Sequence, residues 1–261
     1  MFSSICFIKK GGIIHLDPLE KRFQNIEINR NRLVPPKEET EKQKSKSKFK
    51  NFAMTNKNYE EDFINIIKIY PNALNVFVYL IFQRNKYNNE CNITINQIIK
   101  DLGINKNTTI TSLKILEEND FIKSFKEGRH KIYIINDYII APINKSICDY
   151  HDVNEKYFKS YNNFFKLNYT LKNKDIINNI INQSKYALPI LIFLLFNMDK
   201  SNKIIICKKS IKEKLKISRF ETFEKAIKVL EESNFLKTKR DLKNKTYIFY
   251  IDNYFADNTN N

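Results

Sequence analysis

The sequence contains few of the residues that interrupt or cross-link a chain. Of its 261 residues, 4 are glycine, 6 are proline and 4 are cysteine, and tryptophan is absent. This scarcity, with 42% hydrophobic and 13% aromatic residues, excludes a low-complexity chain and predicts a folded protein of mostly regular structure. The cysteines, which are Cys6, Cys91, Cys148 and Cys207, are too isolated for a disulfide framework or a zinc site. We expect them to be buried thiols.

Long apolar runs are also missing. A membrane-spanning helix needs about 20 consecutive apolar residues, and the longest run, from Ala187 to Phe196, predicts a buried core helix instead. The apolar start, Met1 to Ile8, has no basic leader and is followed at once by Lys9 and Lys10, so no signal peptide is expected. The sequence therefore predicts a cytoplasmic protein without a membrane partner.

Acidic residues are outnumbered. The 45 lysines and arginines exceed the 29 aspartates and glutamates, which gives a formal net charge of +16. Abundant Asn, Ile and Lys indicate an AT-rich genome, and this bias accounts for part of the charge without any functional cause. An excess of this size still indicates an anionic partner.

The charged N-terminal segment differs from the rest of the chain. After Pro35 and Pro36 comes a run of Lys, Glu and Ser without apolar periodicity, and we expect residues 1–53 to be a basic, disordered segment. Met54 follows directly and is an alternative to Met1 as the start of translation.

The remainder contains one unit twice. Residues 73–82 match residues 187–196, and Leu113–Ile122 matches Ile227–Leu236 at the same offset. An aromatic segment precedes each unit, at residues 49–63 and 157–165. We therefore expect a first domain at residues 54–148 and a second at residues 149–257.

In the first unit the pattern predicts three helices and a hairpin. The helix 73–82 is followed by a strand at Ile93 and a helix over 94–102, which Thr94 and Gln97 begin as a capping box. Gly103 ends that helix, and Asn105 caps a third helix that reaches about Asn119, with Thr109, Leu113 and Leu116 on its inner face. Two strands then meet at Glu127 and Gly128.

The second unit repeats this order. Its pattern predicts a strand at 204–206, a helix over 207–215, a third helix capped by Ser218 and ending at Ser233, and a hairpin over 235–251. Helix, turn and helix followed by a β-hairpin is the winged helix. The expected fold class is α+β, mainly α, with two tandem winged-helix domains.

These residues carry a family resemblance. The run from Leu102-Gly103-Ile104 through Thr108 to Ile122 is similar to winged helices of bacterial regulators and plasmid replication initiators. Residues 131–137, and residues 187–199 ending in Phe-Asn-Met-Asp, resemble the RepL-type plasmid replication proteins of low-GC bacteria. That family normally shows one such unit, and this chain has two.

In helix-turn-helix proteins, the start of the last helix enters the major groove of DNA. In the first unit the residues expected there are Lys106, Asn107, Thr108, Thr111 and Ser112. In the second unit they are Arg219, Phe220, Glu221, Lys225 and Lys228. Asn and Thr suit adenine and thymine, whereas Arg reads guanine and Glu accepts from cytosine, so the two units should read different sequences. The alternative is a solvated helix face on a protein-interaction module.

Basic residues also gather on both hairpins, where they would contact phosphates. In the first hairpin they are Lys123, Lys126, Arg129 and Lys131, and in the second Lys237, Lys239, Arg240, Lys243 and Lys245. From 185 to 257 there are 16 basic and 9 acidic residues, against 9 and 7 from 71 to 141. The second unit should therefore dominate affinity.

Signals for an enzyme are poor. His15, His130 and His151 form no His-x-His pair, and no phosphate-binding glycine loop is present. The carboxylate pairs at 117–118 and 231–232 occupy equivalent helix ends, where they fit neighbouring lysines better than acid–base catalysis. We expect no enzymatic activity, no metal and no cofactor.

The sequence thus predicts a protein that binds double-stranded DNA in a sequence-specific way. The leading hypothesis is a plasmid or mobile-element replication initiator that binds origin repeats and recruits host replication proteins. The alternatives are a winged-helix transcriptional regulator and a winged-helix scaffold for other proteins.

Overall fold

The structure, a computed structural model, describes residues 52–128, 130–141, 164–168, 171–241, 246–252 and 256–257. All of them belong to one compact unit, Lys48–Asn261. The segment predicted to be disordered lies outside the described residues, apart from Phe52 and Ala53, which begin a strand.

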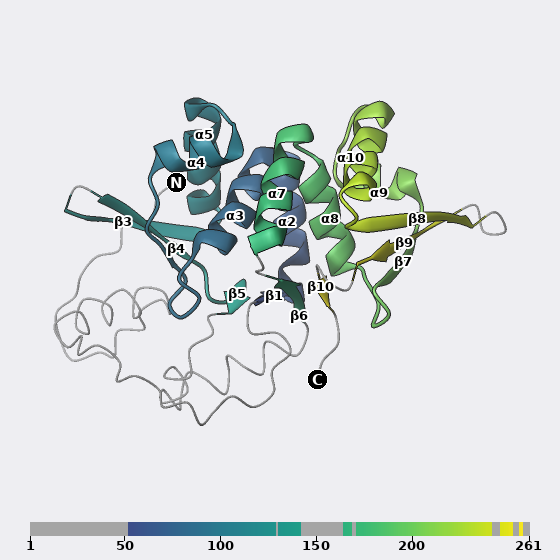
Figure 1. Ribbon diagram of the computed structural model, residues 1–261, viewed down its shortest axis with the longest axis horizontal. Coiled ribbons are helices and arrows are strands. Elements are labelled where there is room, and N and C mark those ends of the chain that lie inside the picture. Colours follow the sequence, from purple (N-terminus) through teal and green to yellow (C-terminus); the bar gives the residue numbers. More distant parts are fainter. Residues whose placement is uncertain are drawn as a thin grey trace, which may run out of the picture. The chain divides into compact units, whose positions relative to one another are not determined.

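The two sequence repeats contain the same succession of elements (Figure 1). The first repeat comprises β1 (Phe52–Asn56), the 3-10 helix η2 (Lys57–Tyr59), α2 (Glu60–Ile69), α3 (Pro71–Gln83), β2 (Glu90–Cys91), α4 (Ile95–Leu102), α5 (Lys106–Glu118), β3 (Ile122–Glu127), β4 (His130–Ile135) and β5 (Ile140–Ala141). The second comprises β6 (Phe164–Asn168), α7 (Leu171–Gln183), α8 (Ala187–Phe196), β7 (Lys203–Ile206), α9 (Lys208–Lys214), α10 (Phe220–Glu232), β8 (Leu236–Asp241), β9 (Thr246–Ile251) and β10 (Ala256–Asp257). The described residues are therefore mainly helical, with three small antiparallel sheets.

Local signals set the ends of the helices in the first repeat. Thr94 caps α4 by accepting from the Gln97 amide N–H at 3.2 Å, and Gly103 ends α4 at a φ of 63°. Asn105 caps α5 by accepting from the Thr108 amide N–H at 2.8 Å. These predictions are confirmed except for half of the capping box, because the Gln97 side chain donates to the Asp101 carboxylate at 2.6 Å instead.

The corresponding turn of the second repeat is built differently. Ser218 does not cap the last helix, so that prediction is wrong: α10 begins at Phe220, and Arg219 holds the N-cap position without a side-chain hydrogen bond. Lys216 takes the left-handed conformation that Gly103 has in the first repeat, with a φ of 52°. The turn from Lys216 to α10 is one residue longer than its counterpart, which moves the cap position past Ser218.

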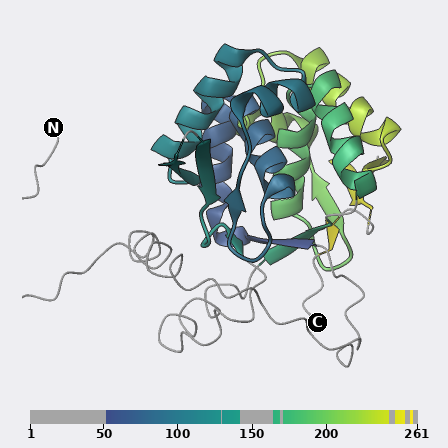
Figure 2. The ribbon, with the colours of Figure 1, turned by 60° about the vertical axis from the view of Figure 1, so that its left-hand side comes forward.

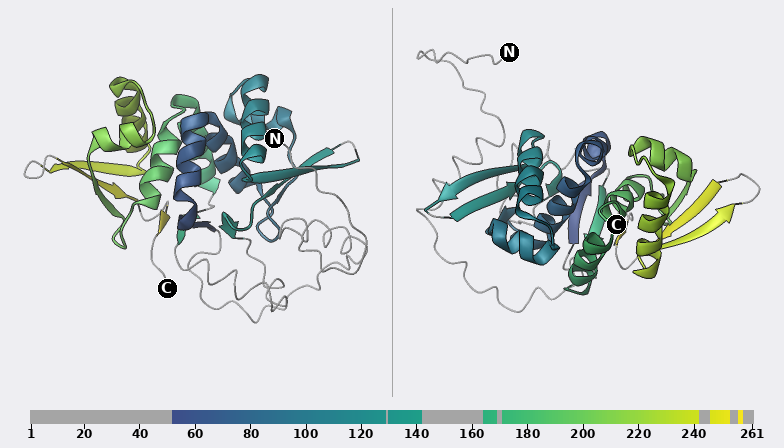
Figure 3. Two further views of the ribbon diagram at one scale, coloured as in Figure 1. Left: turned by 180° about the vertical axis from the view of Figure 1, so that it is seen from behind. Right: turned by 90° about the horizontal axis from the view of Figure 1, so that it is seen from above.

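The hairpin of each repeat forms a three-stranded sheet with a short strand from between the second and third helices of that repeat. The strand orders are β2-β4-β3 in the first repeat and β7-β9-β8 in the second. Ile122 pairs with Ile135, and Leu236 pairs with Ile251 at the equivalent place. The two hairpins extend away from the helices in opposite directions (Figure 3).

A third sheet joins the two repeats, and the sequence analysis did not anticipate it. The first aromatic lead-in contains β1, and the second ends within β6; these two strands pair antiparallel around Met54 and Lys166. The full strand order is β10-β6-β1-β5. Figure 2 shows this sheet at one end of the helices.

The apolar core is continuous between the repeats. Helix α8, the longest apolar run, is buried along its whole length, as predicted. Phe63 of α2 lies 4.9 Å from Phe196 of α8 between ring centroids, and Phe196 lies 5.2 Å from Phe165 of β6. The two repeats therefore share one core and form a single packed body.

Two further expectations are tested by the described residues. Cys91 is buried, and this burial raises the pKa of its thiol to about 12, whereas Cys207 is half-buried; Cys6 and Cys148 lie outside the described residues. No helix that the structure describes is long and apolar enough to cross a membrane.

Candidate nucleic-acid interface

Helix α5 presents one cation, Lys106, and otherwise uncharged exposed side chains at its start. Asn107 and Thr111 are exposed on successive turns, and Lys106 is exposed at the first position. Thr108 is half-buried, and its amide N–H bonds to the Asn105 cap. Four of the five residues predicted in this helix therefore reach its surface.

Ser112 is the exception. Its side chain is fully buried, and its hydroxyl has no hydrogen-bond partner in the structure. The equivalent position in α10 is Ala226, which is also fully buried. Ser112 belongs to the packing face of α5, so the structure contradicts its assignment as a residue that contacts bases.

Ile110 lies on the same surface, although it was not among the residues predicted there. Its side chain is 42% exposed, one turn from Asn107 and next to Thr111. An exposed isoleucine can pack against a thymine methyl group. The signal was its spacing of three residues from Asn107, which places both side chains on one face of a helix.

Helix α10 presents a charged face instead. Arg219, Glu221, Lys225 and Lys228 are all exposed, and Phe220 is 51% exposed at the first helical position. The structure thus places all five predicted residues of this helix at the surface.

The two helices are alike at their ends and differ at their starts. Both carry the same exposed ion pair, Lys114 with Glu118 at 3.5 Å and Lys228 with Glu232 at 3.6 Å. By contrast, Ile110 of α5 is replaced in α10 by Glu224, whose carboxylate accepts from the Lys208 ammonium at 3.0 Å. Apart from Lys106, the start of α5 therefore offers amide, hydroxyl and apolar groups, whereas the start of α10 offers charged groups and the ring of Phe220.

The hairpin residues form a second basic surface. Lys126 on β3 and Lys237, Lys239 and Arg240 on β8 are exposed, and Lys123 is half-buried. Lys131 on β4 lies opposite Lys126 in the strand register, and its ammonium lies 3.4 Å from the Glu117 carboxylate, so it already has an anionic partner within the protein. Arg129, Lys243 and Lys245 lie outside the described residues.

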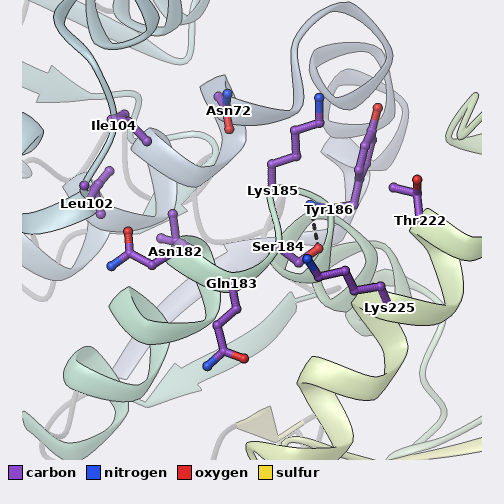
Figure 4. A pocket seen from close by; sticks show the side chains of 12 residues that line it. Asn72, Leu102, Ile104, Asn182, Gln183, Ser184, Lys185, Tyr186, Thr222 and Lys225 are labelled. Atoms are coloured by element: carbon purple, nitrogen blue, oxygen red, sulfur yellow. Dashed lines mark hydrogen bonds between the residues drawn. The ribbon is translucent and has the colours of Figure 1, made fainter.

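A pocket of about 430 Å³ separates the starts of the two helices (Figure 4). On one side it is lined by Gly103 and Ile104, which lead into α5, and on the other by Thr222 and Lys225 of α10. Its floor comes from the junction of α7 and α8, including Lys185. None of its lining residues is acidic, so the pocket suits an anionic group.

Potential metal ligands do not cluster in this region. Across the described residues there is no group of three or more His, Cys, Asp or Glu side chains that could hold a metal ion.

Comparison with protein families decides the relationship of this chain. The model of the Firmicute plasmid replication protein family, RepL, matches twice, at residues 33–145 and 142–253. The chain belongs to the RepL family. Each match covers one of the two repeats, so the chain is a tandem duplication of the RepL unit, as the internal repeat in the sequence predicted. No curated protein and no solved structure shows a significant match to it.

Proposed function

We propose that each repeat is a winged helix and that this RepL protein binds double-stranded DNA at the origin of its plasmid. Helices α4 and α5 and the β3–β4 hairpin supply the elements of that motif in the first repeat, and α9, α10 and the β8–β9 hairpin do so in the second. In this motif the last helix enters the major groove and the hairpin lies along the backbone.

The observation that carries the proposal is the distribution of exposed cations. Arg219 and Lys225 on α10 lie in the same repeat as Lys239 and Arg240 on its hairpin, and all four are exposed. If α10 reads bases and its hairpin contacts phosphates, the exposed cations on both elements have a role. Replication initiation follows from the family, with recruitment of host replication proteins as its next step, and the protein acts by binding rather than by catalysis.

The first test measures binding of the full-length chain to duplex DNA at several salt concentrations. Neutralised phosphates release counterions, so the logarithm of the association constant should fall by about 0.9 per phosphate contact for each log unit of salt. With several contacts, affinity should drop by orders of magnitude between low and moderate salt. If DNA binding is absent, or does not change with salt, the alternative that this protein is a winged-helix scaffold for other proteins would be favoured.

A second test separates residues that read bases from residues that hold phosphates. Arg219→Ala should cost about 1 to 3 kcal/mol on the preferred duplex and far less on scrambled DNA, because a bidentate base contact forms only at the correct base pair. Lys239→Ala is the matched control from the hairpin, and it should weaken both duplexes by similar, smaller amounts. Equal losses on both duplexes for Arg219→Ala would show that α10 does not read sequence.

The structure adds a neutral-face control. Thr111→Ala lies on α5 at the position equivalent to Lys225 and removes no charge. This variant should lose affinity only for the preferred duplex. The salt dependence of its binding should equal that of the unaltered protein.

A further inference from the structure

The two repeats are related by an approximate two-fold axis rather than by a simple translation. Strands β1 and β6 occupy the same place in their repeats, and they pair antiparallel so that Phe52 faces Asn168 while Asn56 faces Phe164. The strand order β10-β6-β1-β5 reads the same from either edge, since β5 and β10 are also equivalent. Self-complementary pairing of equivalent surfaces defines a two-fold interface.

Helix packing follows the same symmetry. Helix α2 of the first repeat packs on α8 of the second, and α7 of the second packs on α3 of the first. The equivalent helices α3 and α8 pack on each other at the centre. The axis therefore runs through the β1–β6 pair and between α3 and α8.

This symmetry places α5 and α10 at equal heights along the axis. Helix α5 packs on α3, α3 on α8 and α8 on α10. Packed helices lie about 8 to 10 Å apart, so the axes of α5 and α10 are at most about 30 Å apart. This upper limit is slightly below the roughly 34 Å that separates successive major grooves on one face of DNA.

The pocket between the two helix starts fits the same arrangement. Equivalent positions at the starts of α3 and α8, Asn72 and Tyr186, both line it, so the pocket lies close to the axis. Lys185 and Lys225 supply positive charge there, and Figure 4 shows both side chains at the pocket. DNA that spans two successive major grooves would pass its intervening backbone over this point.

From this geometry we infer that one chain reads a single DNA site made of two unequal half-sites in inverted orientation, with centres about one helical turn, or roughly 10 base pairs, apart. The inference rests on the proposed DNA binding and adds the layout of the target. The half-sites are inverted because the axis relates the two helices. They are unequal because α5 presents Asn107 and Thr111 where α10 presents Glu221 and Lys225.

The experiment selects duplexes from a library with a random stretch of about three helical turns, using the full-length chain, and counts the chains bound to each duplex. The expected result is two different motifs, inverted and about 10 base pairs apart, with one chain per duplex. Asn107→Ala with Thr111→Ala should erase one motif, and Arg219→Ala with Lys225→Ala should erase the other. Each pair should lower affinity for the complete site about 10-fold or more.

Spacing variants complete the test. Inserting 5 base pairs between the motifs turns one half-site to the opposite face of the DNA, and affinity should fall at least 10-fold. Inserting 10 base pairs should not restore it, because the shared core fixes the distance between the helices. Recovery at 10 base pairs, motifs in direct orientation, a single motif, or two chains per duplex would each overturn the inference. Failure to enrich any sequence would instead overturn the proposed function.

Discussion

The two repeats use different side chains to build the same backbone. The turn from α3 to β2 contains buried Arg84, and the equivalent turn from α8 to β7 contains buried Met198. The residue that ends α4 in a left-handed conformation is Gly103, and the residue in that conformation after α9 is Lys216. Shared apolar positions thus determine the fold, whereas the residues at these two turn positions have diverged.

One polar difference between the repeats is the hydrogen-bond network around Arg84. Its guanidinium donates to the Asn89 side-chain oxygen at 2.7 Å and to the Ala141 carbonyl at 3.1 Å. Asn89 in turn donates to Asp137 at 2.8 Å and to the Ile140 carbonyl at 2.7 Å. This network holds β5 against the end of α3, and the second repeat has the thioether of Met198 in place of its central cation.

Breaking the shared core should have the largest effect. Phe63→Ala removes a ring that contacts Phe77, Phe121 and Phe196, and it should lower the free energy of unfolding by about 3 to 5 kcal/mol. Denaturant unfolding should show one transition for both repeats, because Phe63 packs on each of them. Phe220→Ala, at an exposed ring, is the control and should change stability by about 0.5 kcal/mol or less. Two separate transitions would mean that the repeats fold independently.

Replacing Arg84, the residue at the centre of the polar network, should lower the free energy of unfolding somewhat less than Phe63→Ala does. Arg84→Met introduces the residue of the second repeat but leaves the Asn89 oxygen and the Ala141 carbonyl without this donor. A buried acceptor left without its donor costs at least about 1 kcal/mol, so for these two acceptors we expect a loss of about 2 to 3 kcal/mol in the free energy of unfolding, measured with denaturant. An unchanged midpoint would show that the two turns are interchangeable.

Substitutions at the two left-handed residues, Gly103 and Lys216, should change stability in opposite directions. Gly103→Ala places a side chain at a φ of 63° and brings its Cβ to 2.6 Å from the Asn182 side-chain oxygen, so stability should fall by about 1 to 2 kcal/mol. Lys216→Gly relieves the same backbone cost and should raise stability by up to about 1 kcal/mol. Thermal melts of the two variants check this contrast, and shifts of equal sign would contradict it.

The smallest effect is expected at the helix caps. Asn105→Ala removes the side chain that caps α5 and should cost about 1 kcal/mol. Arg219→Ala at the equivalent cap of α10 should leave the free energy of unfolding nearly unchanged, because Arg219 makes no capping bond. A large loss for Arg219→Ala would also undermine its use as a test of DNA reading.

Much of each repeat could be predicted because its signals are local. Gly103 and Asn105 marked the turn between α4 and α5, and the apolar pairs Leu113 with Ile227 and Leu116 with Leu230 are buried at equivalent places. Most residues of the candidate site could be predicted from those helix boundaries. Ser112 and Ile110 could not, because the boundaries do not show which side of the helix faces the core. Ser218 failed as a cap because a one-residue insertion in a turn leaves no periodic signal.

The sheet between the repeats could not be predicted in the same way. Strands β1 and β6 have five residues each and lie far apart along the chain, and local patterning does not reveal which strand a short segment pairs with. A signal was present in the repeated dipeptide Asn-Phe, whose phenylalanines, Phe52 and Phe164, begin the two strands. Their equivalence indicates a shared role but not that they are partners.

The pairing of β1 with β6 inside one polypeptide has a consequence for dosage. Two separate chains joined by such a strand pair would come apart on dilution, and the fraction assembled would depend on how much protein the cell contains. Here each strand finds its partner on its own chain, so assembly is independent of concentration. Occupancy of a DNA site by this protein would then rise with the first power of its concentration at low abundance, where a dissociating dimer would give a second-power response.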